Sequence, residues 1–174
     1  DILVCTGDVV DLRVDGAERL LEKLASVNAP LGTVLVLGNH DELDCATTLS
    51  SMAINAGLTL LRDATCSVQH GGNTLNISGI DWAKSTKQCN QKVTSVCENS
   101  DTHLLLSHNP KAFIQAAALN IPLTLSGHTH GGQMALKNKK GANLAVAHKY
   151  SAGIYTQEAS NLFVTVGVGA WFPL

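Results

Sequence analysis

The sequence predicts an α/β fold in one domain of 174 residues. Short apolar runs with strand character alternate with segments of helical periodicity, which is typical of parallel sheets covered by helices. The apolar content of 45% is sufficient for a sizeable core. In addition, polar residues of metal-ligand type follow several predicted strands, and α/β sheets bind their ligands outside the carboxyl ends of strands.

The first half of the chain contains two strand–helix pairs. Asp15 is the expected N-cap of the first helix, with Glu18 three residues later, and Gly57 caps the second helix. The strand of the second pair is a continuous β-branched and leucine run, which suits a parallel strand buried on both faces. The predicted elements are a short buried strand at 1–5, a helix at 15–27, a buried strand at 33–37 and a helix at 44–56.

The second half begins with short strand-like runs and then resumes the alternation. Gly71-Gly72-Asn73 reads as a hairpin turn, whereas residues 81–100 are polar and predict a loop plus one short helix. Residues 134–150 are basic and irregular. The predicted elements are strands at 58–62, 66–70 and 74–80, a helix at 91–98, a strand at 103–106, a helix at 111–119, and strands at 123–126 and 162–166.

Composition excludes several classes of protein. The net charge is −2 without a basic block, which argues against general nucleic-acid binding. No apolar run is long enough to span a bilayer, and no signal peptide opens the chain. Five cysteines without a Cys-x-x-Cys pair argue against a disulfide framework, and Cys5 reads as a small core residue. Because the chain starts inside a strand pattern and ends without a polar tail, we expect a piece of a longer protein.

The segment Gly127-His128-Thr129-His130 follows a predicted strand and places two histidines one residue apart. In an extended segment, residues i and i+2 project to the same side, so both rings are expected to face one point. Neutral imidazole is the commonest protein ligand of transition metals. A lone His-x-His is more ordinarily a solvated loop, so the metal interpretation depends on ligand-type residues at other strand ends.

Such residues occur at three further strand ends. Each has a structural alternative, such as a turn or a helix cap, but their occurrence in order at successive strand ends favours a metal site. Two ions about 3.5–4 Å apart can activate a water and bind a phosphate, and a mixed nitrogen and oxygen set favours Mn, Fe or Zn over Ca or Mg. The residues are Asp8 with Asp11, Asn39-His40-Asp41, His108, and His128 with His130.

These motifs resemble those of the calcineurin-like metallophosphoesterase superfamily. The matching stretches are Gly7-Asp8-Val9-Val10-Asp11, Gly38-Asn39-His40-Asp41, Ser107-His108 and Gly127-His128-Thr129-His130. The resemblance implies a four-layer α/β/β/α sandwich with its site on loops at the strand ends. Three later stretches (131–133, 150–155 and 167–171) are similar to the branch of membrane-associated bacterial phosphodiesterases.

The resemblance also implies a role for each residue. Asp8 would bridge two metal ions; Asn39, His108 and His128 would complete the second ion, and His130 would bind the first. His40 would serve the leaving-group oxygen as a general acid or a hydrogen-bond donor. Asp41 would pair with His40, hold its orientation and raise its pKa. Asp11 would orient the loop without binding metal.

One family motif is missing from the sequence. Family members begin with an Asp-x-His motif on the first strand, and none precedes Gly7-Asp8. The family pattern also continues past Leu174 with a further strand. We therefore expect a domain truncated at both ends, in which the second metal site is complete and the first is weak.

The resemblance implies a phosphoric ester hydrolase in which a metal-bridging hydroxide attacks phosphorus in line. The similarity to membrane-associated enzymes favours a phospholipid-like or lipid-linked substrate. Lys137 to Lys149 would then lie near anionic headgroups, although four lysines are more often a solvated loop. Trp171 and Phe172 would line an apolar substrate mouth, although core packing is the more usual role for at least one of them. Membrane association through segments outside this chain is expected on the same ground, with a cytoplasmic location otherwise. The alternatives are a soluble nucleotide phosphodiesterase and a non-catalytic protein-binding module with the same fold.

Overall fold

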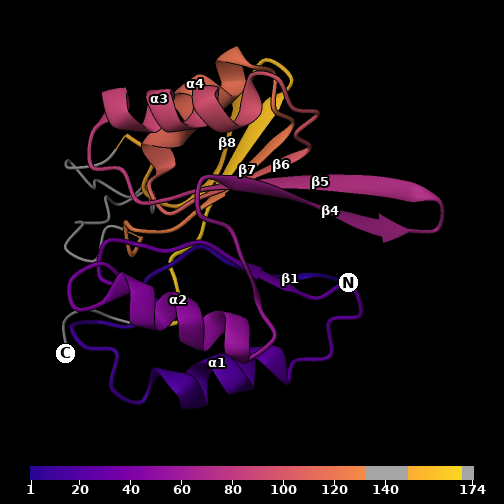
Figure 1. Ribbon diagram of the computed structural model, residues 1–174. Helices are drawn as coiled ribbons and strands as arrows, with labels where there is room; N and C mark the ends of the chain where they lie inside the picture. Colours follow the sequence, from indigo (N-terminus) through magenta and orange to yellow (C-terminus); the bar gives the residue numbers. More distant parts are fainter. Residues whose placement is uncertain (132–148, 170–174) are drawn as a thin grey trace, which may run out of the picture.

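A computed structural model describes residues 1–131 and 149–169 of the chain. Within these residues, two β-sheets lie face to face between two layers of helices (Figure 1). Helices α3 (Thr86–Cys97) and α4 (Phe113–Ala118) cover the six-stranded sheet. Helices α1 (Ala17–Ala25) and α2 (Ala46–Asn55) lie against the three-stranded sheet. The predicted four-layer α/β/β/α architecture is confirmed.

The three-stranded sheet is parallel and has the order β1-β2-β3. Its central strand is the apolar run predicted from the sequence, and alternate side chains of this run serve two different cores. Leu35 and Leu37 pack toward α1 and α2, whereas Val34 and Val36 pack toward the other sheet. Burial on both faces explains why the run contains no polar side chain after Thr33. The strands are β1 (Leu3–Cys5), β2 (Thr33–Leu35) and β3 (Thr59–Leu60).

The six-stranded sheet is mixed and has the order β4-β5-β6-β7-β9-β8. Its four middle strands are parallel, while β4 and β8 pair antiparallel at its two edges. Ile80, Leu105 and Leu162 pack against the helices on its outer face. The strands are β4 (Ala64–His70), β5 (Asn73–Ile80), β6 (Leu104–Ser107), β7 (Leu123–Ser126), β8 (Gly153–Gln157) and β9 (Ser160–Val164).

Three sequence expectations about the helices and strands are wrong in detail. Helix α3 begins at Thr86 rather than at residue 91, because Ser85 and Gln88 form a capping box that starts it earlier. Asp15 does not cap α1; Gly16 is the N-cap residue with φ +79°, and Asp15 bonds Arg13. The edge strand β8 at 153–157 is missing from the predicted elements, although Ile154, Tyr155 and Thr156 are residue types that favour strands.

Other boundaries shift by a few residues, and one strand is less buried than expected. β1 is an edge strand whose residues are only half-buried, because its outer edge has no neighbour among the described residues. The basic segment 134–150 lies almost entirely outside the described residues, as do Trp171 and Phe172. Among the described helices, none combines the length and the apolar character that crossing a bilayer requires.

All five cysteines are free thiols. Cys89 and Cys97 are buried on α3, and burial raises the pKa of Cys89 to about 11. Cys45 lies at the N-cap of α2, where the Thr48 hydroxyl donates to its sulfur at 3.0 Å and lowers the pKa of the thiol.

These environments predict the order in which the thiols react. Because thiolate is the reactive form, iodoacetamide at pH 8 should modify Cys45 well before Cys89 in the folded protein. Thr48→Val should slow the modification of Cys45 and leave that of Cys89 unchanged. Peptide mass spectrometry over time measures both rates. Equal rates in the folded chain would show that α3 does not bury Cys89.

Candidate metal centre

The carboxyl ends of β1, β2, β6 and β7 meet at one edge of the two sheets. Asp8 lies three residues after β1 in a left-handed conformation with φ +56°. Its Oδ1 accepts a hydrogen bond from the His40 amide at 2.9 Å, so the loop after β2 fixes the carboxylate. The second oxygen, Oδ2, is left to face His108 at 3.0 Å. Burial alone would raise the pKa of Asp8, but His108 and the His40 amide hold that pKa below its ordinary value.

Asp41 joins the loops after β1 and β2 from inside the protein. Its fully buried carboxylate accepts backbone hydrogen bonds from Asp8 and Gly38, both at 2.8 Å, and from Val10 at 3.0 Å. Burial nevertheless raises the pKa of this carboxyl above its ordinary value. These contacts belong to the backbone of the two loops, so the structure gives Asp41 a positioning role.

Two glycines let the same loops approach closely. A Cβ atom on Gly7 would lie 2.5 Å from the Gly38 nitrogen, and Gly7 has a φ of +96°. A Cβ atom on Gly38 would lie 2.6 Å from the Asp8 nitrogen and would also overlap the Asp8 carboxylate. The glycines of both motifs are therefore required by backbone contact next to the site rather than by turn geometry alone.

His108 follows β6 and is buried, with both ring nitrogens in defined surroundings. Its Nδ1 lies 2.8 Å from the Thr6 carbonyl oxygen, which can only accept, so Nδ1 carries a proton. In the neutral ring Nε2 then has a lone pair, and this lone pair faces the Asp8 carboxylate at 3.0 Å. Two acceptors at this distance repel each other unless a cation lies between or beside them. Either a second ring proton or a metal ion meets that requirement.

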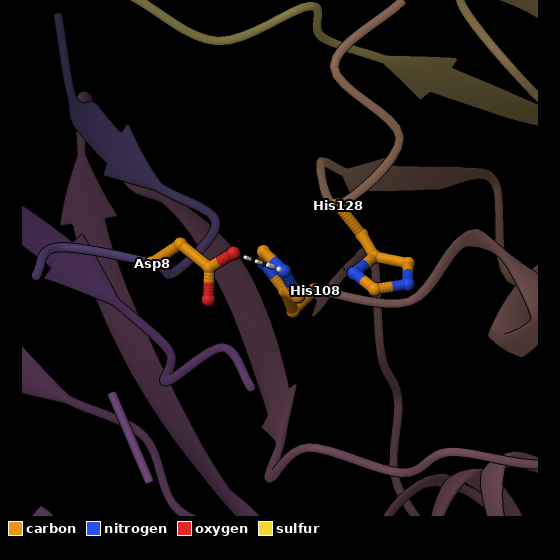
Figure 2. A group of neighbouring side chains, drawn as sticks. All are labelled: Asp8, His108 and His128. Atoms are coloured by element: carbon orange, nitrogen blue, oxygen red, sulfur yellow. Dashed lines mark ion pairs between the residues drawn. The ribbon is translucent and has the colours of Figure 1, made fainter. Parts of the chain in front are cut away.

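His128 completes a group of three possible metal ligands with Asp8 and His108. One ligand atom from each residue lies within 4.8 Å of the others. Figure 2 shows the three side chains pointing toward one another from the loops after β1, β6 and β7. The His128 ring centroid also lies 4.7 Å from that of Trp82, which follows β5. This side chain closes one side of the group and was not identified from the sequence.

The two histidines of the His-x-His motif do not occupy an extended segment. His128 and His130 have φ of +69° and +48°, and Thr129 is bonded within the turn to the Gly127 carbonyl at 2.9 Å. The expectation that both rings project to one side of a strand is therefore wrong. Left-handed residues other than glycine cost about 1–3 kcal/mol each and concentrate at functional sites. Asp8 shares this conformation.

His130 lies beside a second hollow on the other side of Asp8. This cavity of about 230 Å³ is lined by Asp8, Asp11, His40 and His130, among others. The His40 Nδ1 lies 2.7 Å from the Asp11 carbonyl oxygen and 3.0 Å from the Asp11 carboxylate. The expected pairing of His40 with Asp41 is therefore replaced by contact with Asp11, because Asp41 is occupied by backbone amides.

Unpartnered polar atoms test whether these residues suit a metal ion. Among the described residues, six buried side-chain atoms have no hydrogen-bond partner, and three of these are Asn39 Oδ1, His108 Nε2 and His130 Nδ1. Buried polar atoms without partners are costly, and all three belong to residues predicted as ligands. A set of one carboxylate, one amide oxygen and imidazole nitrogens, without thiolates, suits Mn, Fe or Zn. The residues therefore fit a divalent transition metal.

Comparison with known proteins adds independent findings. The family model described as calcineurin-like phosphoesterase matches residues 1–132. An uncharacterized metallophosphoesterase of Aquifex aeolicus is 36% identical over 143 residues, which are 76% of this chain and 51% of that protein. Metallophosphoesterase YkuE of Bacillus subtilis is 28% identical over 175 residues, 97% of this chain and 61% of YkuE. This chain thus spans roughly half to three fifths of these relatives.

A more distant relative has a name that includes a substrate. UDP-2,3-diacylglucosamine pyrophosphatase LpxG of Chlamydia trachomatis is 25% identical over 227 residues, which are 98% of this chain and 69% of LpxG. The named relatives thus include two metallophosphoesterases and one pyrophosphatase.

The contact between the two glycine loops can be tested by adding one methyl group. Gly38→Ala should destabilise the fold by about 1–3 kcal/mol, because the new Cβ overlaps Asp8. The same change should displace the Asp8 carboxylate and weaken metal binding. Urea unfolding and metal titration measure the two effects. Gly169→Ala is the control for the unfolding measurement, since its Cβ meets nothing within 4 Å, and equal destabilisation by both changes would contradict the close approach.

The ligand group predicts how the isolated 174-residue chain binds metal. Asp8, His108 and His128 bring ligand atoms close together, and Asn39 lines the same cavity as His128, so the chain should bind one Zn²⁺ or Mn²⁺ tightly. His108→Ala should weaken this binding by at least about 100-fold, the upper end of what losing an outer partner costs. Calorimetric titration gives the stoichiometry and affinity. The exposed His70 supplies the control His70→Ala, which should bind as the unchanged chain does.

If the chain bound two ions with equal affinity, the expectation of one complete and one weak metal site would be wrong. Unchanged affinity in His108→Ala would remove this histidine from the ligand set.

Proposed function

The chain belongs to the calcineurin-like phosphoesterase family, and on this premise we propose that it hydrolyses a phosphate ester with two divalent metal ions. Asp8 would contact both ions, Asn39, His108 and His128 would complete one, and His130 would contribute to the other. The bound ions would supply Lewis acidity toward the phosphoryl oxygens and a lowered pKa for an attacking water.

One observation carries this proposal. The proton on His108 Nδ1 is fixed by the Thr6 carbonyl, so the Nε2 lone pair faces the Asp8 carboxylate at 3.0 Å. A pair of acceptors held in this way by the fold is suited to sharing a cation. The unpartnered Asn39 oxygen supports the same reading, because it lines the cavity that His128 also lines.

We propose that His40 interacts with the leaving-group oxygen. Its ring lies beside Asp8 and His130 at the second hollow, and Asp11 holds its Nδ1. A ring held through Nδ1 can present Nε2 to the oxygen that departs from phosphorus, as a hydrogen-bond donor or a general acid. Asp11 replaces Asp41 as the residue that orients this ring. Asp41 supports the reaction by fixing the amides of Asp8 and Gly38.

The substrate is proposed to be a phosphodiester or a diphosphate that carries a lipid. LpxG is named for a diacylated sugar nucleotide that contains a diphosphate, and its match covers 98% of this chain. A cavity of about 610 Å³ beside Asn39 and His128 offers room for the part of a substrate that does not react. Lipid-linked and nucleotide substrates should be compared directly with the full-length protein, because the choice between them also decides whether it acts at a membrane.

The role of His40 predicts a loss of turnover without a loss of metal. In the full-length protein, His40→Ala should lower kcat for bis(p-nitrophenyl) phosphate by about 10²- to 10⁴-fold, the usual contribution of a general acid. Metal content, measured by atomic emission, should stay at the level of the unchanged protein. His70→Ala serves as the control for a histidine outside the site.

A variant His40→Ala that lost its metal would instead make His40 a ligand. Undiminished turnover in this variant would remove it from the reaction. Failure of EDTA to stop hydrolysis by the unchanged protein would contradict the metal-dependent mechanism itself.

A further inference from the structure

A basic cavity adjoins the candidate metal centre and has no role in the proposed chemistry. It has a volume of about 610 Å³ and begins at two predicted metal ligands, Asn39 and His128. Lys84 and Lys111 line its other parts, each following a strand that ends at the same edge of the sheet. Lys84 comes after β5, and Lys111 lies in the short 3-10 turn (Pro110–Ala112) after β6.

The two lysines differ from the other cations near this cavity. Arg62 pairs with Asp81 at 2.9 Å, and Lys92 pairs with Asp63. The ammonium groups of Lys84 and Lys111 have no ion pair or hydrogen bond with any described residue. Lys84 also lies just before the N-terminus of α3, where the positive end of the helix dipole disfavours a cation. Neither lysine is therefore held in place by an ion pair within the described part of the chain.

The residues that line the cavity suit a ligand with an anionic group next to a planar or apolar group. Trp82 is part of the cavity lining, and its ring centroid is 4.7 Å from that of His128. Glu42 also lines the cavity, which leaves one excess positive charge from the side chains there. Burial and the charge of Asp81 raise the pKa of the Glu42 carboxyl. A neighbouring hollow of about 380 Å³ shares Trp82 and Lys84 and extends the surface along α3.

We propose that Lys84 and Lys111 bind a second phosphate group of the substrate while the phosphate to be hydrolysed lies at the metal ligands. This inference rests on the proposed phosphoesterase function and names its substrate class as molecules with at least two phosphate groups. Each ammonium supplies up to three donors without an acceptor, which matches phosphate oxygens. The second phosphate either adjoins the reacting one in a diphosphate or stands elsewhere on the same molecule.

Competitive inhibition of the metal-loaded full-length protein separates the two phosphate positions. Methylphosphonate occupies the reacting position alone, whereas methylenediphosphonate and 1,3-propylenediphosphonate add a second phosphonate at short and longer distance. Inhibition constants are measured against bis(p-nitrophenyl) phosphate, which carries one phosphate, at a fixed concentration of free metal. In the unchanged protein, at least one diphosphonate should bind at least tenfold more tightly than methylphosphonate.

The double variant Lys84→Gln, Lys111→Gln should abolish this preference. The diphosphonates should then bind within about twofold of methylphosphonate, while the KM for bis(p-nitrophenyl) phosphate stays within about twofold of its original value. Lys23→Gln with Lys87→Gln is the matched control, because it removes the same charge from exposed positions on α1 and α3 that do not line the cavity. The control should keep the full preference.

Other outcomes would reject the second-phosphate site or the proposed function. An unchanged preference in the double variant would overturn the proposal, and so would an equal loss of methylphosphonate binding, which would place the lysines at the reacting phosphate. If the unchanged protein hydrolyses no ester, the proposed function fails. The same three phosphonates are then compared by calorimetric titration, in which loss of the preference in the double variant still supports the second-phosphate site and its retention rejects that site.

Discussion

The buried carboxylate of Asp41 connects the loops that form the site. It accepts the backbone amides of Asp8, Val10 and Gly38, so the chain after β1 and the chain after β2 are fixed to each other. The glycines at positions 7 and 38 allow this approach because neither leaves room for a side chain. As a consequence the Asp8 carboxylate is held at a defined position facing His108, beyond the point where the pairing of β1 with β2 ends.

Much of the fold could be predicted because burial restricts which residue types a segment can contain. The run at 33–37 must be buried on both faces, and the structure places it between two cores. Helices and strands that depend on a few local contacts rather than on burial are harder to predict. Helix α3 depends on a cap formed by Ser85 and Gln88 within a polar stretch, and the edge strand β8 is short and largely exposed, so burial does not dictate its residue types. Prediction thus succeeded where burial dictates the residue types.

At the candidate site, too, some features could be predicted from the sequence and others could not. The residues at the strand ends could be identified because the parallel topology brings them together, and Asp8, His108 and His128 do meet. Their conformations could not be identified, since the left-handed backbone at His128 and His130 depends on packing. The partner of His40 changed from Asp41 to Asp11 for a similar reason, because two of the amides that occupy Asp41, those of Asp8 and Val10, come from a loop distant in sequence. Trp82 and the two lysines also follow strand ends, which is the signal that could have found them.

The account depends on a cation at the Asp8–His108 pair, and crystallography at the zinc absorption edge tests this directly. Crystals of the chain grown with Zn²⁺ should show an anomalous peak about 2.0–2.2 Å from Asp8 Oδ2 and His108 Nε2, with His128 and Asn39 completing the shell. A map with no peak there, in which His108 Nε2 still lies about 3.0 Å from Asp8 Oδ2, would show that a second ring proton satisfies this pair and would contradict the metal centre.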